Sequence, residues 1–168
     1  MEEELKKYAE RMQFLADKRL NSPVFNEGRE HALILLKTIF STAEDYIYIY
    51  CAQLRDELSG NEEYYEALEN FKKKGKTLRI ILSDADVDLN RNIFKLIGAE
   101  NIRILKSEQK TMMEDNLNHL KAHFTLADDS IYRLEYDIEN FKALASFNDK
   151  KIGMILKNAF EGVWNGTK

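Results

Sequence analysis

Hydrophobic residues recur at helical spacing in several stretches of the chain. Tyr8, Met12 and Leu15 form one stripe in a highly charged first stretch, which is broken at Pro23 because proline disfavours helix at the preceding residue. A glycine at position 75 follows another such stretch, as expected at a helix C-terminus. The pattern predicts helices over residues 2–20, 27–43, 62–74, 89–97 and 149–164.

Short β-branched and aromatic runs predict strands over residues 46–51, 78–82, 101–105, 124–127, 131–136 and 142–147. The run 46–51 is apolar at successive positions, which is typical of a central strand covered on both faces. The first three strands alternate with helices, so we expect them to be parallel with right-handed crossovers. The last three follow one another, and Asp128-Asp129-Ser130 is a turn-forming group. The predicted fold class is α/β, a mixed sheet flanked by helices on both faces.

Composition narrows the function classes. The 168 residues include 25 basic and 29 acidic side chains, a net charge of −4, which argues against general nucleic-acid binding but leaves room for a local phosphate site. The single cysteine, Cys51, excludes an intramolecular disulfide and a Cys-rich zinc site. The acidic start has no apolar signal-peptide core, and no apolar run is long enough to span a bilayer, so we expect a cytoplasmic protein.

The aspartates at 84, 86 and 88 follow a predicted parallel strand, at the kind of edge where α/β proteins bind ligands. An EF-hand loop needs glycine at its sixth position and glutamate at its twelfth, but Leu89 and Lys95 stand there. We therefore expect a solvated loop, no metal and no cofactor.

Near the C-terminus, Ala145-Ser146-Phe147-Asn148 stands directly before the last predicted helix. With its ordered strands and helices, the chain over residues 28–165 resembles the phospholipase D superfamily, as a single repeat of bacterial type. Members carry H-x-K-x-x-x-x-D on a strand and turn, then G-S-x-N before a C-terminal helix. The resemblance implies a phospholipase D-like domain at residues 26–168, preceded by an N-terminal helix and connection at residues 1–25. We expect that helix to pack on a partner or to complete a dimer.

The first motif departs from the family pattern. With Asp128 as the motif aspartate, Lys121 stands where the nucleophilic histidine belongs and His123 where the lysine belongs. The alternative register takes His119 and Lys121 as H-x-K, but then Leu126 stands at the aspartate position. We favour the first register, and the departure indicates a degenerate motif.

The resemblance implies metal-independent phosphodiester transfer through a phosphohistidine, with two motifs facing each other. One chain carries one motif, so a complete site requires a twofold homodimer. The implied catalytic residues are His123, Lys121, Asp128 and Glu135, with His119 as the alternative, and the implied phosphate-binding residues are Asn148, Ser146 and Arg133.

Simpler interpretations of these residues stay open. His119 fits an exposed loop, and Asn148 fits a capping position before the last helix. Arg133 and Glu135, two apart on one strand face, fit a plain ion pair.

Two functions are therefore predicted. The first is a degenerate phospholipase D-like domain that binds a phosphate-containing ligand or a partner protein as a homodimer, with weak or no catalysis. The alternative is an active phosphodiesterase, of nuclease or phospholipase type, with its site shared across the dimer axis. The charge does not favour nucleic acid as the partner.

Overall fold

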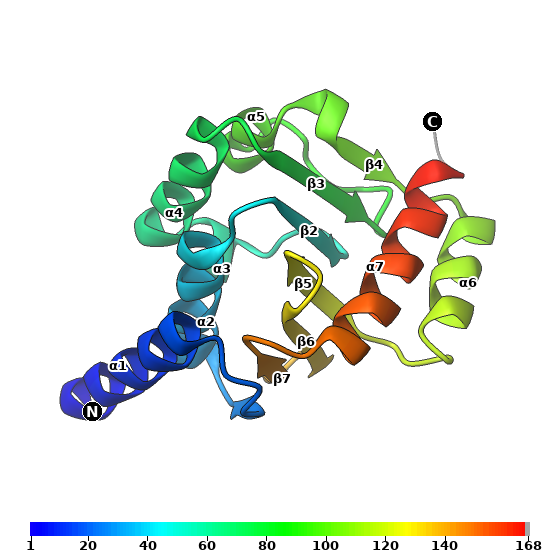
Figure 1. Cartoon of the computed structure of the whole chain (residues 1–168). Coiled ribbons are helices and arrows are strands. Elements are labelled where there is room, and N and C mark those ends of the chain that lie inside the picture. The colour runs from blue at the N-terminus through cyan, green and yellow to red at the C-terminus, as the bar shows by residue number, and fades with distance from the viewer. Residues whose placement is uncertain (167–168) are drawn as a thin grey trace.

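The computed structural model describes residues 1–166, which form helices and strands in the order expected for an α/β protein (Figure 1). The helices are α1 (Glu2–Lys18), α2 (Arg29–Thr42), α3 (Asp56–Ser59), α4 (Glu62–Lys73), α5 (Asn92–Ile97), a 3-10 turn η1 (Ala99–Asn101), α6 (Ser107–Asn116) and α7 (Lys150–Asn165). The strands are β1 (Val24–Asn26), β2 (Tyr46–Cys51), β3 (Thr77–Leu82), β4 (Ile102–Ile104), β5 (His123–Ala127), β6 (Ile131–Asp137) and β7 (Lys142–Ser146).

The strands form one open, mixed sheet in the order β1-β7-β6-β5-β2-β3-β4. β2, β3 and β4 are parallel, as predicted from their alternation with helices. β5 joins β2 antiparallel, and β6, β7 and β1 continue the antiparallel half. The predicted central place of residues 46–51 is confirmed, because β2 lies between β5 and β3.

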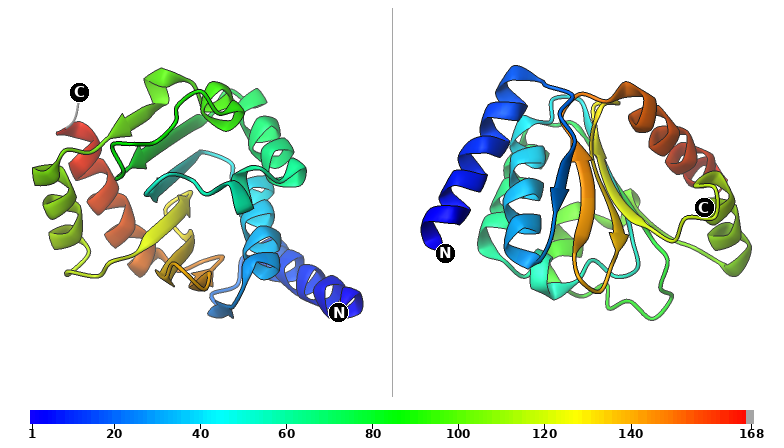
Figure 2. Two further views of the ribbon diagram at one scale, coloured as in Figure 1. Left: turned by 180° about the vertical axis from the view of Figure 1, so that it is seen from behind. Right: turned by 90° about the horizontal axis from the view of Figure 1, so that it is seen from below.

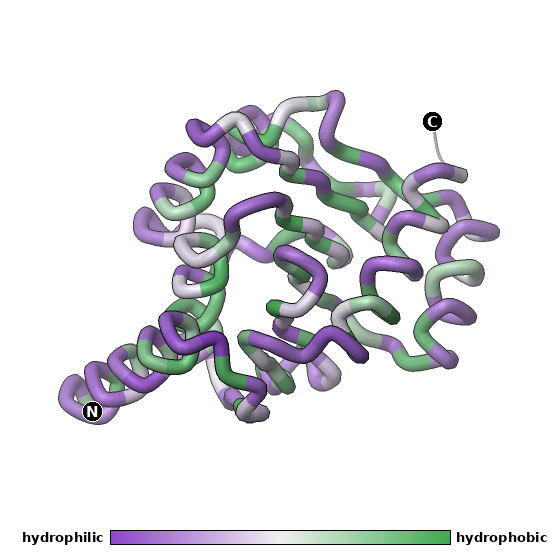
Figure 3. The backbone as a smooth tube through the Cα atoms, viewed as in Figure 1, coloured by the Kyte–Doolittle hydropathy of each residue, from purple (hydrophilic) through white to green (hydrophobic). Residues whose placement is uncertain are grey.

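Helices cover both faces of the sheet, so the predicted fold class is confirmed (Figure 2, right). On one face α1, α2, α4 and α5 pack over a core that includes Ile47, Ile49 and Ile80. On the other face α6 and α7 pack over Tyr48, Phe124 and their neighbours. The strands and the inward sides of the helices carry most of the hydrophobic positions (Figure 3). Within residues 1–166, no helix is both long and apolar enough to cross a membrane.

Four elements were not predicted: β1, α3, the 3-10 turn η1 and α6. β1 lies in the segment read as a connection, where it pairs with β7. The apolar stripe of α1 is buried inside the chain, since Met12, Leu15 and Ala16 join the core next to α2. The N-terminal helix therefore packs on its own chain.

Candidate functional site

A cavity of about 210 Å³ opens where β2 and β3 end and β5 begins. Open α/β sheets commonly bind ligands at the carboxyl ends of their parallel strands. The floor is apolar and includes Leu36, Ile49 and Leu54. The charged and polar residues of the lining come from different strands and loops. They include Gln53, Arg55, Asp84, His123, Arg133 and Glu135.

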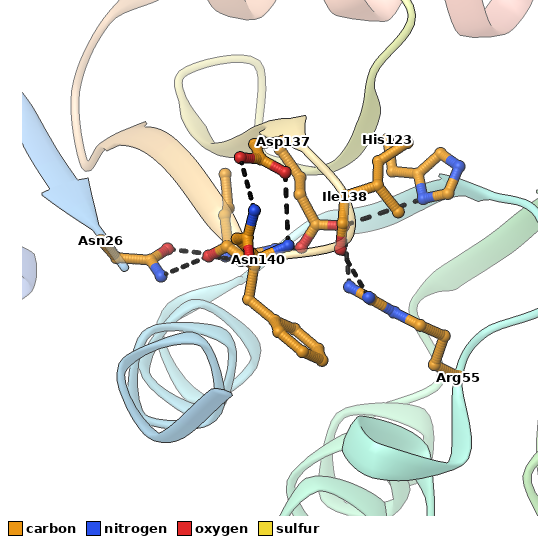
Figure 4. Close-up of polar contacts among 9 residues, drawn as sticks. Asn26, Arg55, His123, Asp137, Ile138 and Asn140 are labelled. Atoms are coloured by element: carbon orange, nitrogen blue, oxygen red, sulfur yellow. Dashed lines mark hydrogen bonds and ion pairs between the residues drawn. The ribbon is translucent and has the colours of Figure 1, made fainter. Parts of the chain in front are cut away.

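Glu135 lies at the centre of the polar cluster, and Figure 4 shows how Arg55 and His123 approach it. Its side chain is 4% exposed, and its two oxygens are bound by different arginines. Arg133 donates to Oε2 at 2.8 Å and Arg55 donates to Oε1 at 3.0 Å. His123, directly opposite on β5, places Nδ1 3.8 Å from Oε1. A buried carboxylate is costly unless it is paired, and here two guanidinium groups pair it.

Arg133 is buried almost completely and has three kinds of partner. Besides Glu135 it donates to Asn26 Oδ1 at 2.9 Å and to the Phe141 carbonyl at 3.1 Å. Asn26 belongs to β1, so the guanidinium reaches across β7, where the facing residues are Ala143 and Ala145. Small side chains at those two positions leave the room that the arginine needs. Burial lowers the pKa of Arg133, and Glu135 opposes that shift.

Arg55, which the sequence analysis did not single out, reaches the cavity from the loop after β2. It donates to the Ile138 carbonyl at 2.6 Å, and its guanidinium stacks 3.8 Å from the centre of the Phe141 ring. These contacts fix a partly exposed arginine at the cavity wall. The sequence feature that could have identified Arg55 is a basic residue just beyond the carboxyl end of a central parallel strand.

His123 is held neutral by its surroundings. Its pKa is lowered to about 4, first by burial and then by the positive charges of Arg55 and Arg133. Its side chain is 20% exposed and lines the cavity. A neutral imidazole can donate one hydrogen bond and accept another.

Asp128 lies at the far end of β5, about 16 Å of strand from His123. Its carboxylate accepts hydrogen bonds from the backbone N–H groups of Glu44, Asp45 and Tyr46, at 2.7, 2.8 and 3.1 Å. The motif aspartate thus clamps the start of β2 and does not meet the histidine.

Ser146 and Asn148 are also not brought to the cavity. Ser146 pairs with Tyr132, about 10 Å along the strands from the row of His123, and donates to Asn21 Oδ1. Asn148 donates to the Arg19 carbonyl. The cap of α7 is Asp149, whose carboxylate accepts from the Ile152 N–H.

The remaining candidates precede β5, which begins at His123. Lys121 is exposed and borders a smaller hollow beside His123. His119 is exposed on the turn after α6 and lies 3.3 Å from Asp115. Of the predicted residues, the structure therefore brings together His123, Arg133 and Glu135.

The aspartate loop after β3 contributes Asp84 to the cavity rim. Its carboxylate accepts hydrogen bonds from the Asp86 N–H and the Gln53 side chain, which lower its pKa. Across residues 1–166, no group of three or more His, Cys, Asp or Glu side chains is arranged to hold a metal ion.

Comparison with known proteins gives structural matches only. No protein-family model matches the chain, and no curated protein matches it. Nuc from Salmonella typhimurium, a phospholipase D family member, superposes with a TM-score of 0.56 at 15% identity, over 88% of this chain and 97% of Nuc. NucT from Helicobacter pylori gives 0.61 at 14% identity, over 88% of this chain and 98% of NucT. TrmBL2, an archaeal chromatin protein with a novel mode of DNA binding, gives 0.60 at 14% identity; the match covers 99% of this chain but 62% of TrmBL2.

These matches, with the sheet order and the helical layers, establish the class of the protein: an α/β protein with a phospholipase D-like fold. The matches cover nearly the whole of Nuc and NucT, 97% and 98% of those chains, so this chain is similar in extent to one such chain.

Proposed function

We propose that this chain is a degenerate phospholipase D-like domain that binds a phosphate-containing ligand in the cavity beside His123, as a homodimer and with little or no catalysis. The observation that carries the proposal is the pair of arginines at the cavity wall. Arg55 and Arg133 share the single carboxylate of Glu135, while His123 is neutral. The two arginines exceed Glu135 by one positive charge, and Asp84 balances that charge over the cavity lining as a whole. The positive charge that suits an anionic group is therefore local to the arginines.

Asp84 limits where an anion would lie. Its carboxylate also lines the cavity, so its negative charge disfavours a phosphate next to it. Arg133 is already engaged by three partners, whereas Arg55 is partly exposed and has N–H groups left to donate. Arg55 is therefore the proposed principal phosphate contact, with His123 as a neutral donor.

The state of His123 argues against the phosphodiesterase alternative. A symmetric composite site needs one neutral imidazole to attack phosphorus and one protonated imidazole to release the leaving oxygen. With a pKa of about 4, on the order of one His123 in a thousand carries a proton at pH 7. Within one chain His123 is therefore suited to act as a nucleophile or base and not as the acid. The residues that match the other motif positions, Lys121 and Asn148, do not line the cavity.

The test is calorimetric titration with inorganic phosphate and phenyl phosphate at pH 7. We expect saturable binding, weakened about tenfold or more in Arg55→Gln, because a charge-assisted hydrogen bond is lost. Arg19→Gln is the matched control, since Arg19 pairs with Glu44 at the surface. Equal binding by the two variants, or none by the unmodified protein, would refute the phosphate site.

The same samples decide between binding and catalysis. We expect no turnover of bis-p-nitrophenyl phosphate at pH 7 without added metal. Turnover that disappears in His123→Ala would establish the alternative, a phosphodiesterase.

A further inference from the structure

The lining of the cavity changes from charged to apolar along a direction that crosses the strands. On β6 the lining residues are Arg133 and Glu135, which form an ion pair, and on β5 they include Thr125 and His123. The strand pairing aligns Arg133 with Thr125, and Thr125 with Ile49 of β2. A ligand that lies across these three strands therefore meets charged groups at one end and an apolar surface at the other.

The aliphatic side chains at the second end come from four separate elements. They belong to α2, β2, the loop after β2 and α3, and together we call them the apolar end: Leu36, Ile49, Leu54 and Leu58. None of the four is more than 7% exposed, so the space that they border lies inside the fold. An apolar group that enters this space leaves water and gains free energy by doing so.

One loop carries parts of both ends. Leu54 and Arg55 are adjacent in the segment between β2 and α3. Leu54 has a φ of 60°, a left-handed conformation that is rare for a leucine, and its carbonyl accepts hydrogen bonds from Arg91 and Ser59. Arg55 holds the loop from the other side through the Ile138 carbonyl. The loop is therefore fixed before a ligand arrives, which lowers the entropic cost of binding.

The volume of the cavity limits the size of the ligand. The cavity holds about 210 Å³, about seven times the roughly 30 Å³ that a water molecule occupies in the liquid. A dry apolar cavity of about 150 Å³ can hold a benzene ring. Pockets for drug-sized ligands are larger, about 300–1,000 Å³. We therefore expect one phenyl-sized group with a phosphate beside it, and not a long chain.

We propose that the ligand of the cavity is a phosphate monoester of a compact apolar alcohol, of about the size of phenyl phosphate. The phosphate lies beside Arg55, and the apolar group packs on the apolar end. This inference rests on the phosphate site of the proposed function and adds the class of ligand that the site selects.

The first test compares two phosphate esters of similar size by calorimetric titration of the whole chain at pH 7. We expect phenyl phosphate to bind about tenfold or more tightly than glycerol 2-phosphate, because only the phenyl ring gains free energy by leaving water. Equal affinities, or tighter binding of the glycerol ester, would overturn the proposed ligand class and leave the phosphate site standing.

Filling the apolar end tests its role directly. Leu58→Phe places a larger side chain in the lining, so it should weaken the binding of phenyl phosphate about tenfold or more and change that of inorganic phosphate less than about twofold. Leu15→Phe is the matched control, because Leu15 is also buried in the core but does not line the cavity. An equal effect of the two variants on phenyl phosphate would overturn the proposal. The comparison of the two esters needs no variant, so it decides the question if Leu58→Phe does not fold.

Phenol carries the ring without the phosphate, so it separates this proposal from the proposed function. We expect phenol to bind more weakly than phenyl phosphate, and Arg55→Gln to weaken the phosphate ester alone. Equal binding of phenol and phenyl phosphate, unchanged in Arg55→Gln, would refute the phosphate site and with it the ester, and would leave the apolar end as a site for the ring alone.

Discussion

At the scale of single residues, the candidate site depends on how its buried charges are paired. Arg133 and Glu135 are both nearly inaccessible to water, and each has several partners within hydrogen-bonding distance. A buried ion pair of this kind contributes little net stability, but removing one partner leaves an uncompensated charge. The pairing thus fixes the shape of the cavity wall, and Arg55 adds the charge that remains available to a ligand.

His123 makes the pH dependence of this arrangement measurable. Its pKa lies below that of a histidine in the unfolded chain, so the unfolded state binds the proton more tightly. The unprotonated imidazole therefore contributes to the free energy of unfolding, by about 3 kcal/mol. This contribution is complete above about pH 6.5 and is lost as the pH falls through about 4. We expect NMR titration of the imidazole to give a pKa near 4. Urea unfolding of the unmodified protein and of His123→Gln should differ in slope over that pH window, and identical pH profiles would contradict the assignment.

At the scale of elements, the position of α7 depends on a close contact between this helix and the turn after β5, which only glycine permits. A Cβ atom at Gly153 would lie 1.8 Å from the Asp129 carbonyl oxygen, in the turn between β5 and β6. Gly153→Ala must therefore displace the helix or the turn. We expect this variant to lower the free energy of unfolding by about 3 kcal/mol or more. Gly162→Ala, in the same helix, meets its nearest neighbour at an ordinary 3.6 Å and should be stabilising by about 0.5–1 kcal/mol. Chemical denaturation of both variants measures the contrast, and similar effects would contradict it.

The elements also show what the sequence could predict. Long periodic segments such as the α7 stripe, and apolar runs such as β2, were predicted because burial imposes their pattern. β1 was missed because three residues carry no readable period, and it is a strand only because β7 offers its edge. α6 was missed because its sequence lacks a clear apolar stripe and Met113 is its one buried residue.

The site was predictable only in part, for a related reason. Arg133 and Glu135 stand two apart on one strand face, so the sequence indicated that they could pair, and the family resemblance grouped them with His123. Arg55 is 80 residues away in the chain, and its approach depends on how the loop after β2 folds over the sheet. The match at Ser146 and Asn148 depended on residue types just before a helix. In the structure β7 places Ser146 on a different row from the cavity, and Asn148 lies beyond that strand and donates to the Arg19 carbonyl.

At the scale of the whole molecule, α1 extends the same core that carries the site. Met12 is fully buried between α1 and α2, while Phe14 on the same helix faces solvent. Met12→Ala should lower the free energy of unfolding by about 2–5 kcal/mol, because apolar burial is lost and a cavity forms. Phe14→Ala should leave that free energy nearly unchanged. Trp164, a buried residue of α7, belongs to the other core, and its fluorescence reports on that side of the sheet. If the chain unfolds as one cooperative unit, Met12→Ala will lower the urea midpoint by Trp164 fluorescence and by far-UV circular dichroism to the same extent. If Met12→Ala lowers the urea midpoint by circular dichroism but leaves the midpoint by Trp164 fluorescence unchanged, residues 1–25 unfold as a separate unit.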